Sequence, residues 1–434
     1  MLTLEAHIDG VWREAGLLRL PDPARGIAGA SRFSYDDTYF FDHAAIDGLD
    51  GDVIDRRALS VRCPVNLESR SWDSWPPWLL DLMPQGVARQ RIAATLNLSP
   101  DGPTSELPIL RRAAGSPIGN LRIREVWAEE QQRLAGVTCP PLTDRDIADR
   151  SERFLEVVDR FAHLASGSSG VQGEWPKALM TRSVRDGAWY PDPFVPTGEG
   201  AEHAIVKLLR SSGAEDALII ASEAPYLEVA RSFGLRVAAP LRYGNGVLFM
   251  PRFDRSVRDG MVLLHGQESL VSALGVAAFG HLAWHEDYLA VVRSASDDPV
   301  ADTLEYLLRD LLNAAMGNPD NHGRNSALHK PATGGVRLSP LYDFAPMRLS
   351  AAGVGRSTRW RCLGGRGIDP DWGRIADAVA FDGLPANRVR QVLLSKLPLL
   401  RNLRQLGLDL GVPPLVVARA FQGDSVADAL ERVV

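Results

Sequence analysis

The spacing of apolar residues changes its character near Arg255. Before this residue, short apolar segments such as 203–209 and 247–250 are separated by turns rich in Gly and Pro, a pattern typical of small antiparallel strands. After it, apolar residues recur at helical spacing, as in 303–316. Since 434 residues are also too many for one hydrophobic core, the sequence predicts an α+β protein of two or three domains.

Two features suggest where the domains meet. Residues 127–143 are polar and end in Pro140-Pro141, which is typical of a linker. The change from strands to helices follows at Arg255. We therefore expect three parts: a β-rich N-terminal subdomain over 1–125, a second and mostly β part over 126–255, and a helical part over 256–434.

Composition argues against several classes of protein. The net charge of -6 gives no reason to expect a nucleic-acid-binding surface. No apolar run approaches the ~18 residues needed to cross a bilayer, and the N-terminal segment lacks the order of a secretory signal. The three cysteines are far apart and form no C-x-x-C pair, which disfavours disulfides and a zinc site. We expect a cytoplasmic protein that contacts neither membranes nor, directly, nucleic acids.

Lysine is rare in this chain. The 48 basic residues include only four lysines, and the other 44 are arginines. A compact ammonium group does what a planar guanidinium cannot, so the few lysines are candidates for special roles. They are Lys177, Lys207, Lys330 and Lys396.

The segment from Met316 to Asn325 is dense in polar groups and lies between an expected helix and an expected strand. A surface turn would explain its Asn, Pro, Asp and Gly residues. A catalytic loop for phosphoryl transfer is the second interpretation, because that reaction needs an Asp to orient and deprotonate the attacking hydroxyl, and oxygen ligands for magnesium. Asp320 and Asn325 reproduce the D-x-x-x-x-N spacing of kinase catalytic loops.

The residues after this loop predict a hairpin. Ala332-Thr-Gly-Gly335 forms the expected turn, and the returning strand ends at Asp343. The hairpin would bring Asp343 beside Asn325, where it could serve as a second metal ligand.

Upstream residues could hold phosphates. The loop Gly167-Ser-Ser-Gly-Val-Gln-Gly173 could cradle a triphosphate with its amides, although a flexible connector has the same composition. Lys207 lies in an apolar strand, either as a phosphate-neutralising lysine or as an exposed residue of an edge strand. Ser222 is expected to cap a helix, so Glu223 in its first turn could orient Lys207 or merely favour the helix dipole. Neither a P-loop nor a G-x-G-x-x-G sequence after a strand is present.

In this order, the motifs resemble those of the HipA-type serine/threonine kinases, the toxins of bacterial type II toxin–antitoxin pairs. The N-terminal part is similar to the small β-rich subdomain of that family through Asp81-Leu-Met-Pro84 and Ile118-Gly-Asn-Leu121. The other matching stretches are Ser169-Gly-Val-Gln172, Pro176-Lys177, Ile205-Val-Lys207, Glu223 with Phe233-Gly-Leu235, Arg252-Phe-Asp-Arg255, His265-Gly-Gln-Glu268, Asp320-x-His322-x-x-Asn325 and Leu338-x-Pro-x-Tyr-Asp343.

The resemblance implies a bilobal protein-kinase-like fold that uses ATP and Mg²⁺. It makes Asp320 the catalytic base and assigns magnesium to Asn325 and Asp343. It implies ATP contacts from Ser169, Gly170, Val171, Gln172, Lys207, Pro251, Arg252, Phe253, Gln267, His322, Asn325, Tyr342 and Asp343.

The phosphate loop departs from the family pattern. Gly173-Glu-Trp175 separates Gln172 from Pro176-Lys177, and Gly167 occupies the position of the regulatory serine. Neighbouring candidates for autophosphorylation are Ser166, Ser168 and Ser169.

The resemblance also implies a protein substrate, such as an aminoacyl-tRNA synthetase or another translation factor, whose phosphorylation arrests growth. It further implies a HipB-like, DNA-binding antitoxin as a partner. Two alternatives stay open: a small-molecule kinase on the same fold, and a catalytically idle ATP-binding partner protein.

Overall fold

Buried apolar side chains form three clusters along the chain. The computed structural model describes residues 1–49, 51–162, 175–365 and 370–432. One cluster joins residues between Leu2 and Val126, a second joins residues between Leu142 and Phe249, and the largest extends to Leu430. Helix α7, Ala214–Ser232, contributes to this largest cluster. The three sequence ranges proposed as domains stay a prediction.

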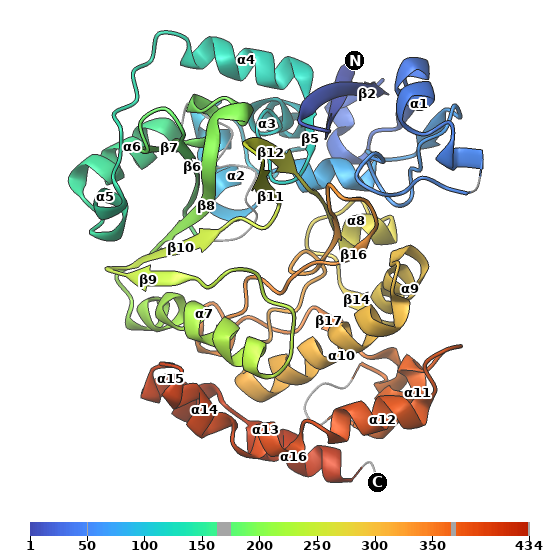
Figure 1. Ribbon diagram of the computed structural model, residues 1–434, viewed down its shortest axis with the longest axis vertical. Helices are drawn as coiled ribbons and strands as arrows, with labels where there is room; N and C mark the ends of the chain where they lie inside the picture. The colour runs from blue at the N-terminus through green and yellow to red at the C-terminus, as the bar shows by residue number, and fades with distance from the viewer. Residues whose placement is uncertain (50, 163–174, 366–369, 433–434) are drawn as a thin grey trace.

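The N-terminal part is a five-stranded antiparallel sheet covered by short helices (Figure 1). Its strands lie in the order β4-β3-β2-β1-β5, and β1 is buried along its whole length. The elements are β1 Leu2–Ile8, β2 Val11–Arg19, β3 Ser31–Tyr35, α1 Asp37–His43, β4 Arg70–Trp72, the 3-10 helix η3 Pro77–Leu82, α2 Gly86–Thr95, α3 Glu106–Ala113, β5 Leu121–Ile123 and α4 Arg124–Leu134.

The expected linker over 127–143 is wrong in its first half. Helix α4 continues to Leu134 because Val126, Glu130 and Leu134 recur every four residues and are all buried on one face.

A second antiparallel sheet lies beside the first, in the order β7-β6-β8-β10-β9 (Figure 1). Strand β8 is therefore central, paired with β6 on one side and β10 on the other. Its elements are α5 Asp144–Ala148, α6 Glu152–Ala162, β6 Lys177–Ser183, β7 Trp189–Pro191, β8 Gly200–Leu208, α7 Ala214–Ser232, β9 Arg242–Gly244 and β10 Val247–Pro251.

Helix α7 corrects one expectation. Ser222 does not cap it, since the helix begins at Ala214 and Ser222 lies inside it, donating a hydrogen bond to the Leu218 carbonyl one turn earlier. Glu223 thus lies in the middle of a long helix, not in a first turn where the helix dipole would explain it.

The remainder of the chain is mostly helical, as expected, with small sheets at its junction with the N-terminal parts (Figure 1). Strands β13, β15 and β16 pair antiparallel, so the predicted hairpin after Asn325 is confirmed. The elements are β11 Arg255–Arg258, β12 Met261–Leu264, β13 Gly266–Ser269, α8 Leu270–Leu274, β14 Ala283–Trp284, α9 His285–Ala295, α10 Pro299–Met316, β15 Ala327–Lys330, β16 Arg337–Leu338, β17 Thr358–Arg359, α11 Trp372–Val379, α12 Ala386–Leu394, α13 Leu397–Arg401, α14 Leu403–Asp409, α15 Pro414–Ala420 and α16 Gly423–Glu431.

Helix α10 places the polar loop of the sequence motif. Asp298 caps its start by accepting from the Ala301 amide, and Pro299 occupies the first turn. Gly317 ends the helix in the left-handed conformation (φ 69°), against the Ala420 carbonyl of α15. Among the described residues, no helix is both long and apolar enough to cross a membrane.

Replacing Gly317 with Ala should destabilise the protein by about 2 kcal/mol or more, because a Cβ there has both a left-handed φ and a close contact. An ideal Cβ at Gly317 would lie 2.6 Å from the Ala420 carbonyl oxygen. Gly353→Ala is the matched control, since Gly353 has a similar φ of 66° but open space around it. Urea unfolding should show a clearly larger loss for Gly317→Ala. Equal losses would mean that Ala420 does not restrict the end of α10.

Candidate active site

Three charged side chains from separate parts of the chain meet beside the central strand. Nζ of Lys207, on β8, lies 2.6 Å from Oε2 of Glu223 on α7 and 3.0 Å from Oδ1 of Asp343, beyond β16. The side chains of Lys207 and Glu223 are only 2% and 1% exposed. The alternative of an exposed lysine on an edge strand is therefore wrong.

Electrostatics keep Lys207 and Asp343 ionised. Burial alone would lower the pKa of Lys207, but the carboxylates of Asp343 and Glu223 outweigh it and raise that pKa well above its usual value. Burial would raise the pKa of Asp343, yet Lys177 and Lys207 together hold that pKa well below its usual range. Lys207 and Asp343 are therefore both charged at neutral pH.

A second lysine, Lys177, belongs to the site; the rarity of lysine made it a candidate for a special role, but it is not among the residues expected to contact ATP. It lies directly opposite Lys207 in the antiparallel register of β6 and β8, so both side chains share one face of the sheet. Its Nζ is 4.0 Å from Oδ2 of Asp343, and burial lowers its pKa. Lys177 lines the large cavity beside the cluster, whereas Lys207 lies beneath the cavity surface.

The catalytic-loop motif forms an internally bonded turn after Gly317. The Asp320 amide donates to Oδ1 of Asn318 (3.2 Å), and Nδ2 of Asn325 donates to the Asp320 carbonyl (3.1 Å). The Asn325 amide also donates to the His322 carbonyl (2.9 Å). These bonds hold Asp320 and Asn325 in one compact arrangement. Using Nδ2 in this way leaves the Asn325 amide oxygen as the atom suited to a cation.

The loop is also held from the other side by Thr358 on β17. Nδ2 of Asn321 donates to the Thr358 carbonyl, the Thr358 amide donates to Oδ1 of Asn321, and the Thr358 hydroxyl donates to the Asn321 carbonyl. Thr358 is fully buried. The residue after Asp320 is therefore fixed by three hydrogen bonds of 2.7 to 3.1 Å.

Two adjoining cavities share Asn325, Tyr342 and Asp343. The larger extends from these residues past Lys177 to an apolar region, and the smaller extends towards Asp320 and His322. Apolar residues on the larger cavity include Ile205, Leu227, Val237, Met250 and Leu341. A flat, mostly apolar ligand with a charged end would thus have the charged end at the lysines and the loop.

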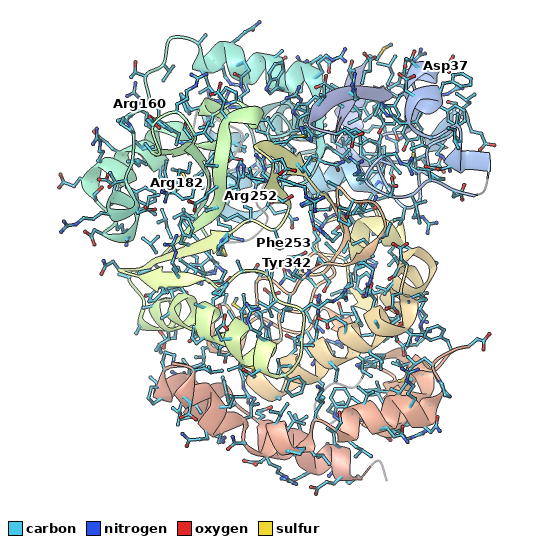
Figure 2. The ribbon with its side chains drawn as sticks, in the orientation of Figure 1. Asp37, Arg160, Arg182, Arg252, Phe253 and Tyr342 are labelled. Atoms are coloured by element: carbon cyan, nitrogen blue, oxygen red, sulfur yellow. The ribbon has the colours of Figure 1, made fainter. Side chains whose placement is uncertain are left out.

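Phe253 and Tyr342 are two of the three aromatic residues that line the larger cavity, the third being Trp78. Phe253 and Tyr342 lie near the centre of the molecule with ring centroids 5.8 Å apart (Figure 2). The Tyr342 hydroxyl donates to the Arg324 carbonyl (2.9 Å), which fixes the ring to the loop that contains Asp320 and Asn325. Pro251, at the end of β10, also lines this cavity.

Arg252 and Gln267 reach the same cavity but are engaged within the protein. The Arg252 guanidinium is buried and bonds to Asp254 and Asp192, while its backbone amide donates to the His203 carbonyl. It thus shapes the wall of the cavity, and its side chain is not available for a nucleotide without breaking an ion network. Gln267 pairs with Nδ1 of His329 at 2.5 Å.

The other residues implied by the resemblance divide into two groups. His322 is partly exposed, and its Nε2 lies 3.6 Å from Oδ1 of Asp320. The remaining residues all lie outside the described part of the chain: Ser169, Gly170, Val171 and Gln172 for ATP, with Ser166, Ser168 and Ser169 for autophosphorylation.

The side-chain oxygens of Asp343 and Asn325 fit magnesium when a bound phosphate supplies further ligands. Among the described residues, no group of three His, Cys, Asp or Glu side chains could form a metal cage. Asp343 and Asn325 offer a carboxylate and an amide oxygen on one cavity. Magnesium is commonly held by one or two carboxylates and substrate phosphates, so this pair suits a cation that arrives with a phosphate ligand.

Comparison with known proteins agrees with this arrangement. The chain is 28% identical over 308 residues to Y4mE of Sinorhizobium fredii (strain NBRC 101917 / NGR234), which is named as a kinase, covering 66% of this chain and 67% of that protein. The fold of this chain is similar to that of HipA in the Shewanella oneidensis MR-1 complex of HipA, HipB and operator DNA. The TM-score is 0.65 at 16% identity, over 100% of this chain and 97% of that one. This likeness confirms the α+β, kinase-like fold predicted from the sequence.

A family model described as the HipA-like C-terminal domain matches residues 169–396, which is more than half of the chain. The match contains both lysines of the site, Glu223, the catalytic-loop motif and Asp343. This chain therefore belongs to the HipA-like C-terminal domain family.

Proposed function

We propose that this protein is an ATP- and Mg²⁺-dependent serine/threonine kinase of the HipA type. The observation that carries the proposal is the placement of Lys177, Asp343 and Asn325 on one cavity beside the loop of Asp320, with the buried Lys207 bonded to Asp343. Phosphoryl transfer relies on positioning and on stabilising charge, and these residues supply both. The kinase name of the relative from Sinorhizobium fredii supports it further.

In the proposed reaction a substrate hydroxyl oxygen forms a bond to the γ-phosphorus while the bond to the β–γ bridging oxygen breaks, releasing ADP. Asp320 orients the hydroxyl and accepts its proton. Lys177, which lines the cavity, neutralises phosphate oxygens. Lys207 keeps Asp343 ionised and in place through their 3.0 Å contact.

Adenine would occupy the apolar part of the larger cavity, next to Phe253 and Tyr342. Asn325 and Asp343 would hold Mg²⁺ through their side-chain oxygens. Bound Mg²⁺ would supply positive charge to the phosphate oxygens. The Lys207 ammonium group, which contacts the same Asp343 carboxylate, would add a second positive charge beside the metal.

We infer a protein substrate in the cytoplasm, of the translation-factor or aminoacyl-tRNA synthetase class, whose phosphorylation arrests growth. The HipB present in the complex of the Shewanella protein supports a HipB-like antitoxin as partner. Because the net charge of this chain is -6, contact with operator DNA would come through that partner.

Replacing Asp320 with Asn should reduce phosphoryl transfer by about 100-fold or more, the usual effect of losing a general base. The isosteric amide keeps the size of the side chain, so ATP affinity should change little. Incubation with γ-labelled ATP, Mg²⁺ and a cell lysate measures transfer, and titration calorimetry measures binding. The exposed Asp382→Asn is the matched control and should behave as wild type.

The same assay separates the alternatives. Labelling of a protein that disappears in Asp320→Asn supports the proposal. Transfer from ATP to metabolites alone would favour a small-molecule kinase. Tight ATP binding with no transfer to any acceptor would contradict a kinase and favour an idle binding protein.

The two lysines should differ when each is replaced by Met. Lys177→Met should weaken ATP binding by about tenfold or more with little loss of stability, because it removes a cation whose burial is itself unfavourable. Lys207→Met should cost about 3–5 kcal/mol of stability, because Glu223 is left buried without its partner. Titration calorimetry measures the ATP affinity of each variant, and urea unfolding measures its stability.

The double variant Lys207→Met with Glu223→Leu is the control for this prediction. Replacing a whole buried pair by apolar groups is often close to neutral, so stability should recover while transfer stays low. Recovery of transfer together with stability would show that Lys207 acts only in folding.

A further inference from the structure

A buried ion pair joins the N-terminal subdomain to the catalytic loop. Asp81 lies on η3, whose apolar residues Trp78, Leu79, Leu80 and Leu82 are all buried. Its Oδ1 lies 2.5 Å from Nη1 of Arg324, the residue immediately before Asn325. The two side chains are only 14% and 4% exposed. Residues 243 positions apart are thus paired within the molecular interior.

Arg324 is fixed from several directions. Its guanidinium carbon lies 5.2 Å from the ring centroid of Phe279, and Nη2 donates to the Ala278 carbonyl (3.4 Å). Its own carbonyl accepts from the Tyr342 hydroxyl at the cavity. Arg324 therefore has little freedom to move independently of the group that holds its guanidinium, and Asn325 follows it directly.

Asp81 also fixes the strand that flanks the loop. Its Oδ2 accepts from the Ser269 amide (2.9 Å) and its Oδ1 from the Ser269 hydroxyl (2.7 Å), at the end of β13. The next amide, that of Leu270, donates to the carbonyls of Gly323 and Ser326. One carboxylate thus connects to both ends of the segment that contains Asn325.

A second buried contact of the same subdomain offers a comparison. Glu268 on β13 accepts from the Ser60 hydroxyl (2.5 Å) and the Val61 amide (2.9 Å), and it pairs with Lys330 at 2.8 Å. This contact joins the N-terminal subdomain to β13 and β15 without touching residues 320–326. A variant that removes this contact therefore weakens attachment of the subdomain without removing a contact of the loop.

We propose that Asp81 is a positioning residue for phosphoryl transfer, which acts through Arg324 on the metal ligand Asn325. The N-terminal subdomain is then part of the active site, not only an attachment to it. Attachment alone does not require a buried charge, because η3 is already buried among apolar residues. A buried ion pair adds little stability over apolar packing, but it restricts the arrangement of its neighbours. The inference rests on the proposed function, since it deepens the role of Asn325.

The test compares Asp81→Asn with Ser60→Ala in the full chain. The probe is Mn²⁺ bound together with the non-hydrolysable analogue adenylyl imidodiphosphate and detected by electron paramagnetic resonance. Groups that orient a metal ligand typically change metal affinity by 10–100-fold, so the half-saturating Mn²⁺ concentration should rise at least about tenfold in Asp81→Asn only. Amide hydrogen exchange over 320–326 should also quicken in that variant only.

Kinetics complete the test. Asp81→Asn should lower kcat by about tenfold with a smaller change in KM for ATP, and Arg324→Lys, which keeps the charge but loses the planar fork, should lie between it and wild type. Asp81→Asn combined with Arg324→Lys should be no slower than Asp81→Asn, because both act through one contact.

The inference and the proposed function can fail separately. If the wild type transfers no phosphate but Asp81→Asn still weakens Mn²⁺ binding and loosens the loop, the kinase proposal fails and the positioning role stands. If Asp81→Asn and Ser60→Ala match in Mn²⁺ affinity and exchange, the positioning role is overturned whatever the activity. Should Asp81→Asn not fold, Arg324→Lys decides the same comparison with Ser60→Ala.

Discussion

The ammonium group of Lys207 is the point on which the site depends. An ammonium in the protein interior is strongly unfavourable unless carboxylates surround it, and Glu223 and Asp343 provide them at 2.6 and 3.0 Å. Glu223 lies on α7, the helix that follows β8 in the chain, whereas Asp343 lies 136 residues beyond Lys207, in the segment after β16. The requirement to neutralise one lysine therefore holds the sheet, the long helix and the end of the hairpin in a single arrangement.

The same arrangement accounts for the behaviour of Asp343. Its backbone has a positive φ of 52°, an uncommon conformation for a residue with a side chain, though one that Asp tolerates better than most. Lys177 and Lys207 form ion pairs with its carboxylate and keep its pKa low. Asp343 and Asn325 place one carboxylate and one amide oxygen beside the loop of Asp320, so a cation would be favoured there when phosphate oxygens complete its ligands. This donor set agrees with the proposal that the metal binds together with a nucleotide.

Much of this could be predicted from local sequence. The spacing of Asp320 and Asn325 and the turn at 332–335 depend on neighbouring residues, and the predicted hairpin formed. The pairing of Lys177 with Lys207 depends on the register of β6 and β8, which no local pattern reveals, so the sequence made Lys177 a candidate without assigning it to the ATP site. Glu223 was correctly paired with Lys207, but its helix was expected to start too late, because Ser222 resembles an N-cap residue although it lies inside α7. Arg252 and Asp192 are 60 residues apart, so local sequence could not predict their ion pair either.

The rarity of lysine gave information that no motif contained. Three of the four lysines bond to carboxylates in the interior: Lys177 and Lys207 near Asp343, and Lys330 with Glu268 at the boundary with the N-terminal subdomain. An ammonium presents three donors from one small atom, so it can approach two carboxylates from different elements, as Lys207 does. A guanidinium is larger and directs its donors in one plane, which suits the extended contacts of Arg324 with Asp81, Ala278 and Phe279. In a chain that otherwise uses arginine, three of the four lysines therefore lie where one compact cation faces carboxylates in the protein interior.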